Sequence, residues 1–520
     1  MCHRVGFAQA KMAISTRTRS VGGAPNKTMI TIVTMAATVM QVLDTTIANV
    51  ALPHMQGSLG ATQDQIAWVL TSYLVASAIA TPVTAWLASQ LGRTRLFTFA
   101  LAGFTVASML CGIATTLPEM VLFRLLQGVF GAALVPLSQA ILLDTYPRSE
   151  VGRAMGIFSM GVMVGPILGP ILGGYLTDQF TWRWCFYINV PLGILAILGA
   201  IAFIPETSRA IGRKLDWAGF GLLSLAIASL QLALDRGEQK GWFQSPEIMM
   251  EAALMVFGLY MFIVHSATTR RPFFDVRLFR DRTFVLSNAI MTLIMLVYYG
   301  SMALTPQMLQ GELNYPVLTA GLVMAPRGLG TIGAILLVGR ITKLTGPRLL
   351  IGFGLALSAL SLYLMSGWSL MISPREIILL GLLQGASIGF INVPLTTNAF
   401  TTLDDDLRTE ASGFYNLMRN IGSAAGISIT SAILVSSAQI NHGYLSEFMT
   451  PYRHIDTPLG MTKTAGLAFL NADLTRQAMM ISYINVFMIL AILCLLIVPV
   501  VLFLHVPRVP PSGEPMVLGE

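Results

Sequence analysis

The stretch MQVLDTTIANVALP, Met40 to Pro53, places a carboxylate inside a mostly apolar run that begins near Met29. An Asp at the centre of a membrane helix costs roughly 2.5 to 3.5 kcal/mol on insertion scales, so such residues normally face a cavity or the bundle interior and belong to proton, ion or substrate pathways. The stretch therefore predicts a functional role for Asp44, and proton transfer is the chemistry that suits a buried carboxylate.

A second charged residue, Arg124, lies in another apolar run, five residues after Glu119. Because Asp44 lies nine residues before Pro53, a rise of ~1.5 Å per residue puts the two side chains about 14 and about 8 Å from their outer helix ends, which are compatible depths. A low dielectric favours the protonated acid, whereas a nearby guanidinium favours the carboxylate. We hypothesise that Asp44 is the proton-coupling acid and Arg124 its partner. The alternative is a static buried pair that only fixes the fold.

Other polar residues within apolar runs are candidates for a substrate cavity. Arg327 lies near the middle of its run, and Arg419 lies beside two asparagines. Charges at such depth usually line a water-filled cavity, so contact with a substrate or anion is favoured over pairing with backbone carbonyls. The candidate cavity residues are Gln41, Thr45, Asn49, Gln127, Arg327, Asn416 and Arg419.

The composition indicates a polytopic membrane protein. Of the 520 residues 54% are hydrophobic and only 11% are charged, and the mean hydropathy is +0.70. A spanning helix needs roughly 20 predominantly apolar residues. Fourteen such runs are expected, near 29–52, 66–88, 96–116, 120–143, 152–175, 184–204, 216–234, 248–266, 284–307, 317–339, 349–366, 376–400, 411–437 and 481–505.

The basic residues are distributed unequally between the two sets of connections. The two tails and the loops after even-numbered helices hold 22 Lys and Arg residues, and the opposite loops hold seven. By the positive-inside rule both termini are cytoplasmic. The net charge of +7 is therefore a topology signal, and no nucleic-acid partner is expected.

An internal repeat divides the chain into two halves. LLQG occurs at Leu125–Gly128 and Leu382–Gly385, and the same offset of 257 carries three glycines of the fifth run onto glycines of the thirteenth. The predicted all-α fold therefore has two parallel six-helix halves, an architecture in which substrate binds between the halves. The expected domains are a basic cytoplasmic tail (1–27), a first bundle (28–204), an inserted helix pair with a linker (205–283), a second bundle (284–505) with a long periplasmic loop (438–480), and a cytoplasmic tail (506–520).

The fifth run, GRAMGIFSMGVMVGPILGPILGGYL, is rich in small residues at mostly four-residue spacing. Such spacing lets a neighbouring helix approach closely, and the prolines should bend the segment. The residues with this structural role are Gly161, Gly165, Pro166, Gly169, Pro170, Gly173 and Gly174.

Several of these motifs resemble the fourteen-helix drug:proton antiporters of the major facilitator superfamily, the EmrB/QacA branch, and are more similar to its EmrB-type exporters. GVMVGPILGPILGGYL resembles the antiporter motif, LDTTIANVALP the first-helix motif and RLLQGVFGAA the fourth-helix motif with its arginine. WRWCFYINVPLG and APRGLGTIGA are also similar. The cytoplasmic loop motif keeps Gly92 and Arg93 but has Ser89 where the family has an acid, which puts a charge-based lock at Ser89 in doubt.

The resemblance implies proton-coupled efflux of hydrophobic or amphipathic toxic compounds across a bacterial inner membrane by alternating access. It also implies a periplasmic adaptor of the EmrA type and an outer-membrane channel as partners, with the loop 438–480 as contact. Two alternatives are a dedicated exporter of one metabolite, siderophore or lipid, and a non-transporting membrane receptor or scaffold. The proton gradient is the expected energy source, without a cofactor.

Enzyme chemistry has no visible basis in the sequence. The Gly328–Gly333 segment GLGTIG matches a dinucleotide fingerprint but lies inside a membrane run without a preceding strand, and no phosphate-binding Gly-Lys-Ser/Thr loop occurs. The six histidines never pair at metal spacing, and the four cysteines lack disulfide or zinc spacing. We therefore expect no metal and no catalytic residues.

Two connections are longer than the rest. Residues 267–283 form a basic linker that we expect to lie on the anionic inner leaflet. Within the outer loop, TAGLAFLNADLTRQAMM can place Leu467, Leu470, Leu474 and Met479 near one helical face, which would rest on the membrane or on a partner.

Overall fold

The computed structural model describes residues 26–147, 150–206, 215–237, 240–270, 272–404, 407–448 and 463–504, and this part of the chain is helical and contains no strand. The helices in chain order are α2 (Lys27–Ser58), α3 (Gln63–Ile66), α4 (Trp68–Leu91), α5 (Arg93–Ile113), α6 (Leu117–Gly131), α7 (Leu134–Thr145), α8 (Val151–Gln179), α9 (Trp184–Tyr187), α10 (Asn189–Phe203), α11 (Trp217–Arg236), the 3-10 helix η2 (Trp242–Gln244), α12 (Pro246–Thr268), α13 (Val276–Arg280), α14 (Arg282–Gly311), α15 (Val317–Met324), α16 (Pro326–Thr345), α17 (Pro347–Met365), α18 (Pro374–Thr401), α19 (Arg408–Glu447) and α20 (Lys463–Val501).

The predicted fourteen spans are present as helices. Thirteen stretches of the described chain are long and apolar enough to cross a membrane, with α6–α7, α9–α10 and α15–α16 each acting as one stretch. The remaining span is α8, which runs unbroken through Pro166 and Pro170. The chain is therefore an all-α polytopic membrane protein, as the composition predicts.

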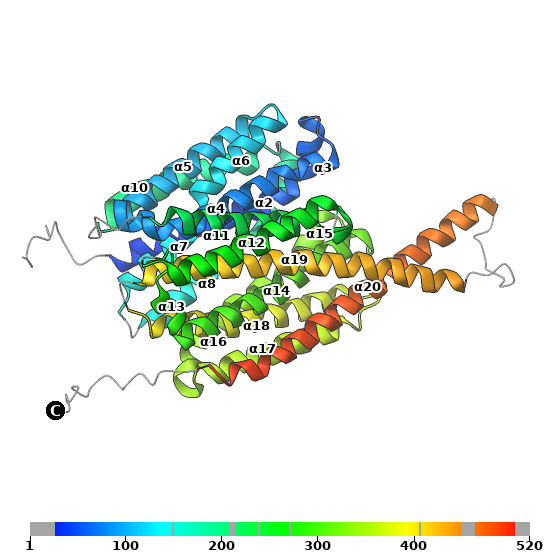
Figure 1. The fold of residues 1–520 in the computed structure, drawn as a ribbon. Coiled ribbons are helices and arrows are strands. Elements are labelled where there is room, and N and C mark those ends of the chain that lie inside the picture. Colours follow the sequence, from blue (N-terminus) through cyan, green and yellow to red (C-terminus); the bar gives the residue numbers. More distant parts are fainter. Residues whose placement is uncertain are drawn as a thin grey trace, which may run out of the picture.

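The spans form two six-helix halves and an inserted pair, which pack side by side in one bundle (Figure 1). The first half runs from α2 to α10, the second from α14 to α20, and the inserted helices are α11 and α12. We call the end of the bundle where α2 begins and α20 ends the terminal side, and the end from which α19 and α20 project the hairpin side (Figure 1).

Close helix contacts repeat at the predicted offset. Gly128 of α6 approaches the backbone of Tyr73 in α4, and its equivalent Gly385 of α18 approaches the backbone of Arg327 in α16. Likewise α8 packs on α2 through its glycines, and the equivalent helix α19 packs on α14 through Gly422 and Gly426. The same pairs of helices thus meet at glycines in both halves, which supports the repeat read from the sequence.

The glycines of α8 form one face against α2. A Cβ atom at Gly165 would lie 2.7 Å from the Val42 carbonyl carbon and 2.9 Å from the Leu43 nitrogen, so no side chain fits there. Gly169 and Gly173 also approach backbone atoms of α2, whereas Gly161 meets only side chains of α2 and Gly174 faces open space. The hydroxyl of Thr46 also donates to the Gly165 carbonyl at 3.0 Å. The axis of α2, which carries Asp44, is therefore fixed relative to α8.

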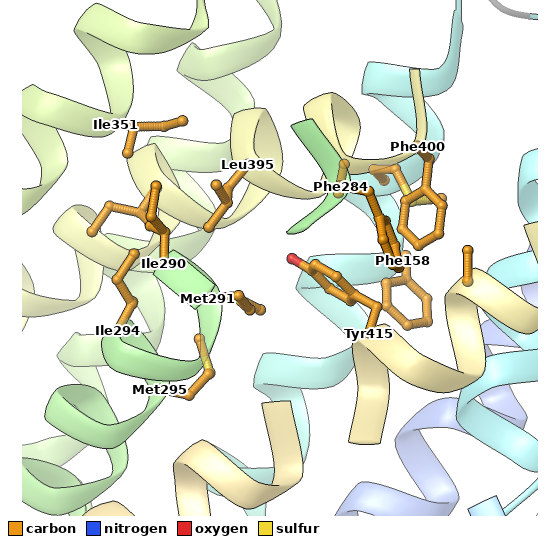
Figure 2. Packing of buried hydrophobic residues seen from close by; sticks show 14 of the residues in the cluster. Phe158, Phe284, Ile290, Met291, Ile294, Met295, Ile351, Leu395, Phe400 and Tyr415 are labelled. Atoms are coloured by element: carbon orange, nitrogen blue, oxygen red, sulfur yellow. The ribbon is translucent and has the colours of Figure 1, made fainter. Parts of the chain in front are cut away.

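Buried clusters show where the two halves meet. The largest joins Phe158 of α8 in the first half to Phe284, Phe400 and Tyr415 in the second half (Figure 2). All four lie in the parts of their helices that are near the terminal side. Toward the hairpin side the buried residues separate into one cluster within the first half and another within the second half. Among the described residues, the large core that the halves share therefore lies on the terminal side, whereas toward the hairpin side α8 meets α15 in a smaller contact, in which a Cβ atom at Gly321 would lie 3.5 Å from Ile171.

The inserted helix α11 lies along the seam between the halves. The Thr71 hydroxyl of α4 donates to the Asp235 carboxylate of α11, and the Ser428 hydroxyl of α19 donates to the Leu234 carbonyl of α11. Through these adjacent residues α11 contacts both halves near the hairpin side. The second inserted helix, α12, packs on α11 through Gly258, which approaches the Ala226 backbone.

The linker packs on protein where the sequence led us to expect lipid contact. Phe274 and Leu278 are buried, and the Phe274 ring lies 5.2 Å from the Phe414 ring of α19. The backbone N–H of Asp275 donates to the Glu410 carboxylate of α19. Its phenylalanines therefore attach this part of the linker to the second half, a contact that the basic composition does not reveal.

The segment 438–480, expected as a long loop, is largely helical. Residues up to Glu447 continue α19, and α20 begins at Lys463; residues 449–462 lie outside the described part. Polar side chains join the two helices, with Asn441 donating to the Ser482 hydroxyl at 2.9 Å and His442 lying 3.3 Å from the Asn471 oxygen. Of the expected apolar face, Leu474 is buried and Leu467 is exposed. We call the projecting helix ends, 438–447 and 463–480, the hairpin.

Replacing Gly165 by alanine tests the contact between α2 and α8. The added methyl group meets backbone atoms of α2 that cannot rotate away, so we expect a loss of about 1 to 3 kcal/mol, typical of overpacking. A lower midpoint of thermal unfolding of the purified protein in detergent would show it. The matched control is Gly174→Ala, which meets nothing within 4 Å and should be neutral or stabilising because alanine favours helix. Equal melting of both variants would contradict the tight contact.

Candidate functional site

Asp44 and Arg124 form an ion pair inside the first half. The Arg124 Nη1 atom donates to Asp44 Oδ2 at 2.7 Å, and both side chains are almost completely excluded from solvent. Asp44 comes from α2 and Arg124 from α6. The compatible depths estimated from the sequence thus correspond to a direct contact.

The second carboxylate oxygen of Asp44 accepts two amide donors. Gln127 of α6 donates from Nε2 to Oδ1 at 2.9 Å, and Asn189 of α10 donates from Nδ2 to the same atom at 2.8 Å. The Asn189 amide also donates to the Ser108 hydroxyl of α5 at 3.0 Å. Donors from two helices therefore satisfy this carboxylate, and a third helix, α5, holds one of those donors in place.

Arg124 is held by a separate set of contacts. Its Nε donates to the Val69 carbonyl of α4 at 3.0 Å, and its Nη1 also donates to Gln127 Oε1 at 2.8 Å. The guanidinium carbon lies 4.4 Å from the centre of the Tyr73 ring, a cation–π distance. The guanidinium therefore keeps its position on α4 and α6 even if Asp44 moves away.

Two opposing effects act on Asp44: its three donors favour the charged carboxylate, whereas its complete burial favours the protonated acid. A carboxylate that accepts three N–H donors, one of them cationic, has its charge compensated although it is buried. Proton uptake would require α2 to separate from α6 or α10 and water to reach the acid. All three partners belong to the first half, so a movement within this half alone would separate them from the acid.

The other residues expected around Asp44 have different surroundings. The Gln41 amide donates to the Tyr73 hydroxyl at 2.9 Å, so Gln41 belongs to the outer layer of this network. The Thr45 hydroxyl donates to the Val42 carbonyl of its own helix at 2.7 Å. The Asn49 side chain is exposed and does not belong to the network around Asp44.

The three expected cavity residues of the second half have three different surroundings. Asn416 donates to Gln139 Oε1 of α7 at 2.7 Å, so it joins the two halves on the terminal side. Arg327 donates through Nη2 to Gln384 Oε1 of α18, and Gln384 in turn donates to the Ser301 hydroxyl at 2.7 Å. Arg419 has no hydrogen-bond or ion-pair partner for its guanidinium among the described residues.

The cytoplasmic loop motif contributes to a contact between the halves. Gly92 has φ +88°, a conformation that favours glycine, and it turns α4 into α5. Arg93 then pairs with Asp144 of α7, and Arg408 of α19 lies 3.5 Å from the same carboxylate. Ser89 donates to the Trp86 carbonyl of its own helix and does not join the halves. Asp144 therefore connects the halves at this loop.

The sequence did not assign roles to Asn189, Ser108, Tyr73, Asp144 or Arg408. Asn189 lies in the quoted WRWCFYINVPLG motif, and a neutral amide in an apolar run was the signal that could have identified it. In the described part of the chain, no group of three His, Cys, Asp or Glu side chains is placed to hold a metal ion.

Comparisons with known proteins agree with this architecture. A family model described as Major Facilitator Superfamily matches residues 34–427. The chain is 33% identical over 500 residues to the multidrug export protein EmrB of Escherichia coli (strain K12), which covers 92% of this chain and 95% of that protein. It is 34% identical over 474 residues to the fatty acid resistance protein FarB of Neisseria gonorrhoeae, covering 89% and 93%. The crystal structure of the human organic anion transporter MFSD10 (TETRAN) shares the fold, with a TM-score of 0.60, 14% identity and coverage of 90% and 100%.

The family model spans most of the chain, and the sequence relatives extend over nearly its full length. The motifs that resemble this family correspond to three features of the structure: the two halves, the glycine contacts of α8, and the charged pair on α2 and α6. That resemblance is confirmed. The chain belongs to the Major Facilitator Superfamily, among its EmrB-like exporters, and is a membrane transporter and not an enzyme.

Proposed function

We propose that this protein exports hydrophobic or amphipathic toxic compounds across a bacterial inner membrane in exchange for protons. The observation that carries the proposal is Asp44, a fully buried carboxylate whose three donors lie on helices other than its own. The similarity to a multidrug export protein supports drug efflux. One proton that moves inward through 100 mV supplies about 2.3 kcal/mol before any pH gradient is counted.

The proposed cycle alternates between two states, in each of which the halves are closed on one side of the membrane and open on the other. The excess of basic residues supports a cytoplasmic location of the terminal side, and with that orientation the shared terminal-side core corresponds to a state closed toward the cytoplasm. In this state Asp44 is paired and charged. We propose that protonation releases α2 from Arg124 and allows the halves to rock, and that loss of the proton on the cytoplasmic side restores the pair.

The dedicated exporter remains the second candidate. The relative FarB is named for resistance to fatty acids, so one scaffold in this family serves a narrower purpose. Competition among chemically unrelated compounds for efflux would favour the multidrug reading, and inhibition by one compound class alone would favour the dedicated exporter. A receptor would release no protons when a compound is added to the purified protein.

The substitution Asp44→Asn tests proton coupling. The amide keeps the size of the side chain but cannot carry the charge, so we expect pH-driven efflux from proteoliposomes to fall at least about a hundredfold, as for loss of an essential proton-transfer group. Exchange of labelled for unlabelled cargo should persist, because it needs no net proton movement. The control is Asp473→Asn on the exposed hairpin. Normal pH-driven efflux by Asp44→Asn would overturn the coupling role.

The substitution Asp144→Asn tests the contact between the halves. It removes the charge shared by Arg93 and Arg408, and for a partly exposed carboxylate we expect a loss of roughly 1 kcal/mol, a fivefold shift toward opening on the terminal side. Spin labels at Leu91 and Leu349, exposed residues at the terminal ends of α4 and α17, should report a larger population at long distance.

The control for the Asp144 experiment is Glu150→Gln. Glu150 pairs with Lys27 in a salt bridge whose side chains are 43% and 45% exposed, so its removal should leave the distance distribution unchanged. Identical distance distributions for Asp144→Asn and the unsubstituted protein would show that the Asp144 carboxylate does not help to close the terminal side.

We also propose that the hairpin binds a periplasmic adaptor that leads to an outer-membrane channel. Apolar side chains are exposed on both hairpin helices and at Phe448, which directly follows α19; they are Ile440, Tyr444, Phe448, Leu467 and Phe469. Side chains of this kind in water mark interaction sites. Because the hairpin projects beyond the bundle (Figure 1), a partner can reach it without touching the transport helices.

The double substitution Ile440→Ser and Tyr444→Ser tests the adaptor contact. Both side chains are exposed, so the thermal midpoint should change little, whereas co-purification of an EmrA-type adaptor from the same operon or organism should be lost because central apolar contacts dominate interfaces. The control is Ser446→Ala on the same helix. Undiminished adaptor recovery with the double variant would exclude this face as the contact.

A further inference from the structure

The membrane interior of the second half carries uncompensated positive charge. Between residues 284 and 505 the described acidic residues lie at helix ends, in connections or on the hairpin; they are Glu312, Glu376, Asp404, Glu410, Glu447 and Asp473. The other acidic residues of this stretch, Asp405, Asp406 and Asp456, lie outside the described part of the chain. Arg327 lies inside the span that α15 and α16 form together, and Arg419 lies inside α19, away from the helix ends. The first half is different, because Asp44 neutralises Arg124.

Arg327 is buried with part of its guanidinium unused. Its side chain is 5% exposed, and its Nη1 atom has no hydrogen-bond partner within the described part of the chain. The neutral amide of Gln384 accepts from Nη2, and the guanidinium carbon lies 6.0 Å from the Tyr298 ring. A neutral acceptor and a ring face orient the cation but do not cancel its charge.

Arg419 lies on the face of α19 that looks toward the first half. Ser412 and Asn416 of this helix both donate to Gln139 of α7, and Arg419 follows Asn416 by three residues, which places it on the same face. It therefore lies one turn beyond the contact that closes the terminal side. The side chain is partly exposed, and no described residue pairs with its guanidinium.

Two adjacent tyrosines connect the surroundings of these arginines. Tyr298 and Tyr299 of α14 have ring centres 5.6 Å apart, and the Arg327 guanidinium carbon lies 6.0 Å from the centre of the Tyr298 ring. Tyr415 lies one helical turn before Arg419 on α19; its hydroxyl is hydrogen-bonded to the Thr396 hydroxyl at 2.8 Å and points toward Met291 and Leu395 (Figure 2). The cations are thus bordered by phenol groups and by apolar side chains.

An unpaired guanidinium in a low dielectric is costly unless an anion compensates it. Guanidinium and tyrosine hydroxyl groups are donors that suit a carboxylate or phosphate, and the neighbouring methionine and leucine side chains suit a hydrocarbon chain. We propose that Arg419, assisted by Arg327, forms a subsite for the anionic head group of an amphipathic cargo. This inference rests on the proposed export function and specifies the charge of a preferred cargo class.

Binding of matched twelve-carbon probes tests the subsite. The full chain in phosphatidylcholine nanodiscs should bind labelled dodecanoate at least about tenfold more tightly than dodecanamide or dodecyltrimethylammonium, because charge-assisted hydrogen bonds are strong. Arg419→Gln should remove this preference without changing dodecanamide binding, and Arg419→Lys should retain part of it. Arg327→Gln should weaken it too, provided that the variant keeps the unsubstituted melting temperature. Arg375→Gln, an exposed arginine of the same half, is the control.

Transport measurements separate cargo from lipid and this inference from the export function. Arg419→Gln should lose proton-driven efflux of dodecanoate but retain that of a neutral or cationic cargo. Equal binding of the three probes, or unchanged dodecanoate affinity in Arg419→Gln, would overturn the subsite. Displacement of dodecanoate by phosphatidylglycerol together with no dodecanoate efflux would assign the site to lipid and overturn the cargo assignment. Failure of proton-driven efflux for every cargo would instead reject the proposed function itself.

Discussion

The Asp44 carboxylate is the constraint on which the first half depends. It accepts donors from α6 and α10, while α2, its own helix, is fixed to α8 by glycines. A buried charge of this kind is stable only while its donors stay in place, because removing one partner leaves an uncompensated ion. The positions of α2, α6 and α10 are therefore linked through one side chain.

The two halves share a repeat but differ in charge. Equivalent glycines bring equivalent helices together in both, yet the position equivalent to the glutamine Gln127, which contacts the acid, is Gln384, which contacts Arg327. In the first half the glutamine assists a neutralised pair. In the second it faces a cation without an acid. The repeat thus supplies one scaffold on which the two halves carry different electrostatics.

The sequence predicted the fold because apolar runs, glycine spacing and basic loops are patterns of residues that lie close together in the sequence. It also located Asp44 and Arg124, since charges in apolar runs stand out and their depths can be estimated. Asn189 and Ser108 were missed because neutral polar residues are common in such helices and their partners lie on other helices. The hairpin was predicted as a loop because its polar residues pair across two helices, which the sequence does not show. Asp144 was missed because attention went to position 89, where Ser89 replaces the acid expected to join the halves, whereas the carboxylate that joins them belongs to α7.

The inserted helix α11 restricts how the halves can move. Its adjacent residues Leu234 and Asp235 accept hydrogen bonds from α19 and α4, one helix of each half. The distance between those two helices is therefore held along this flank by a single rigid turn. In the proposed cycle these contacts would make rotation of the halves asymmetric: the flank with α11 would act as the hinge, and the wider gap would open along the opposite flank, where α8 contacts α15 and α16.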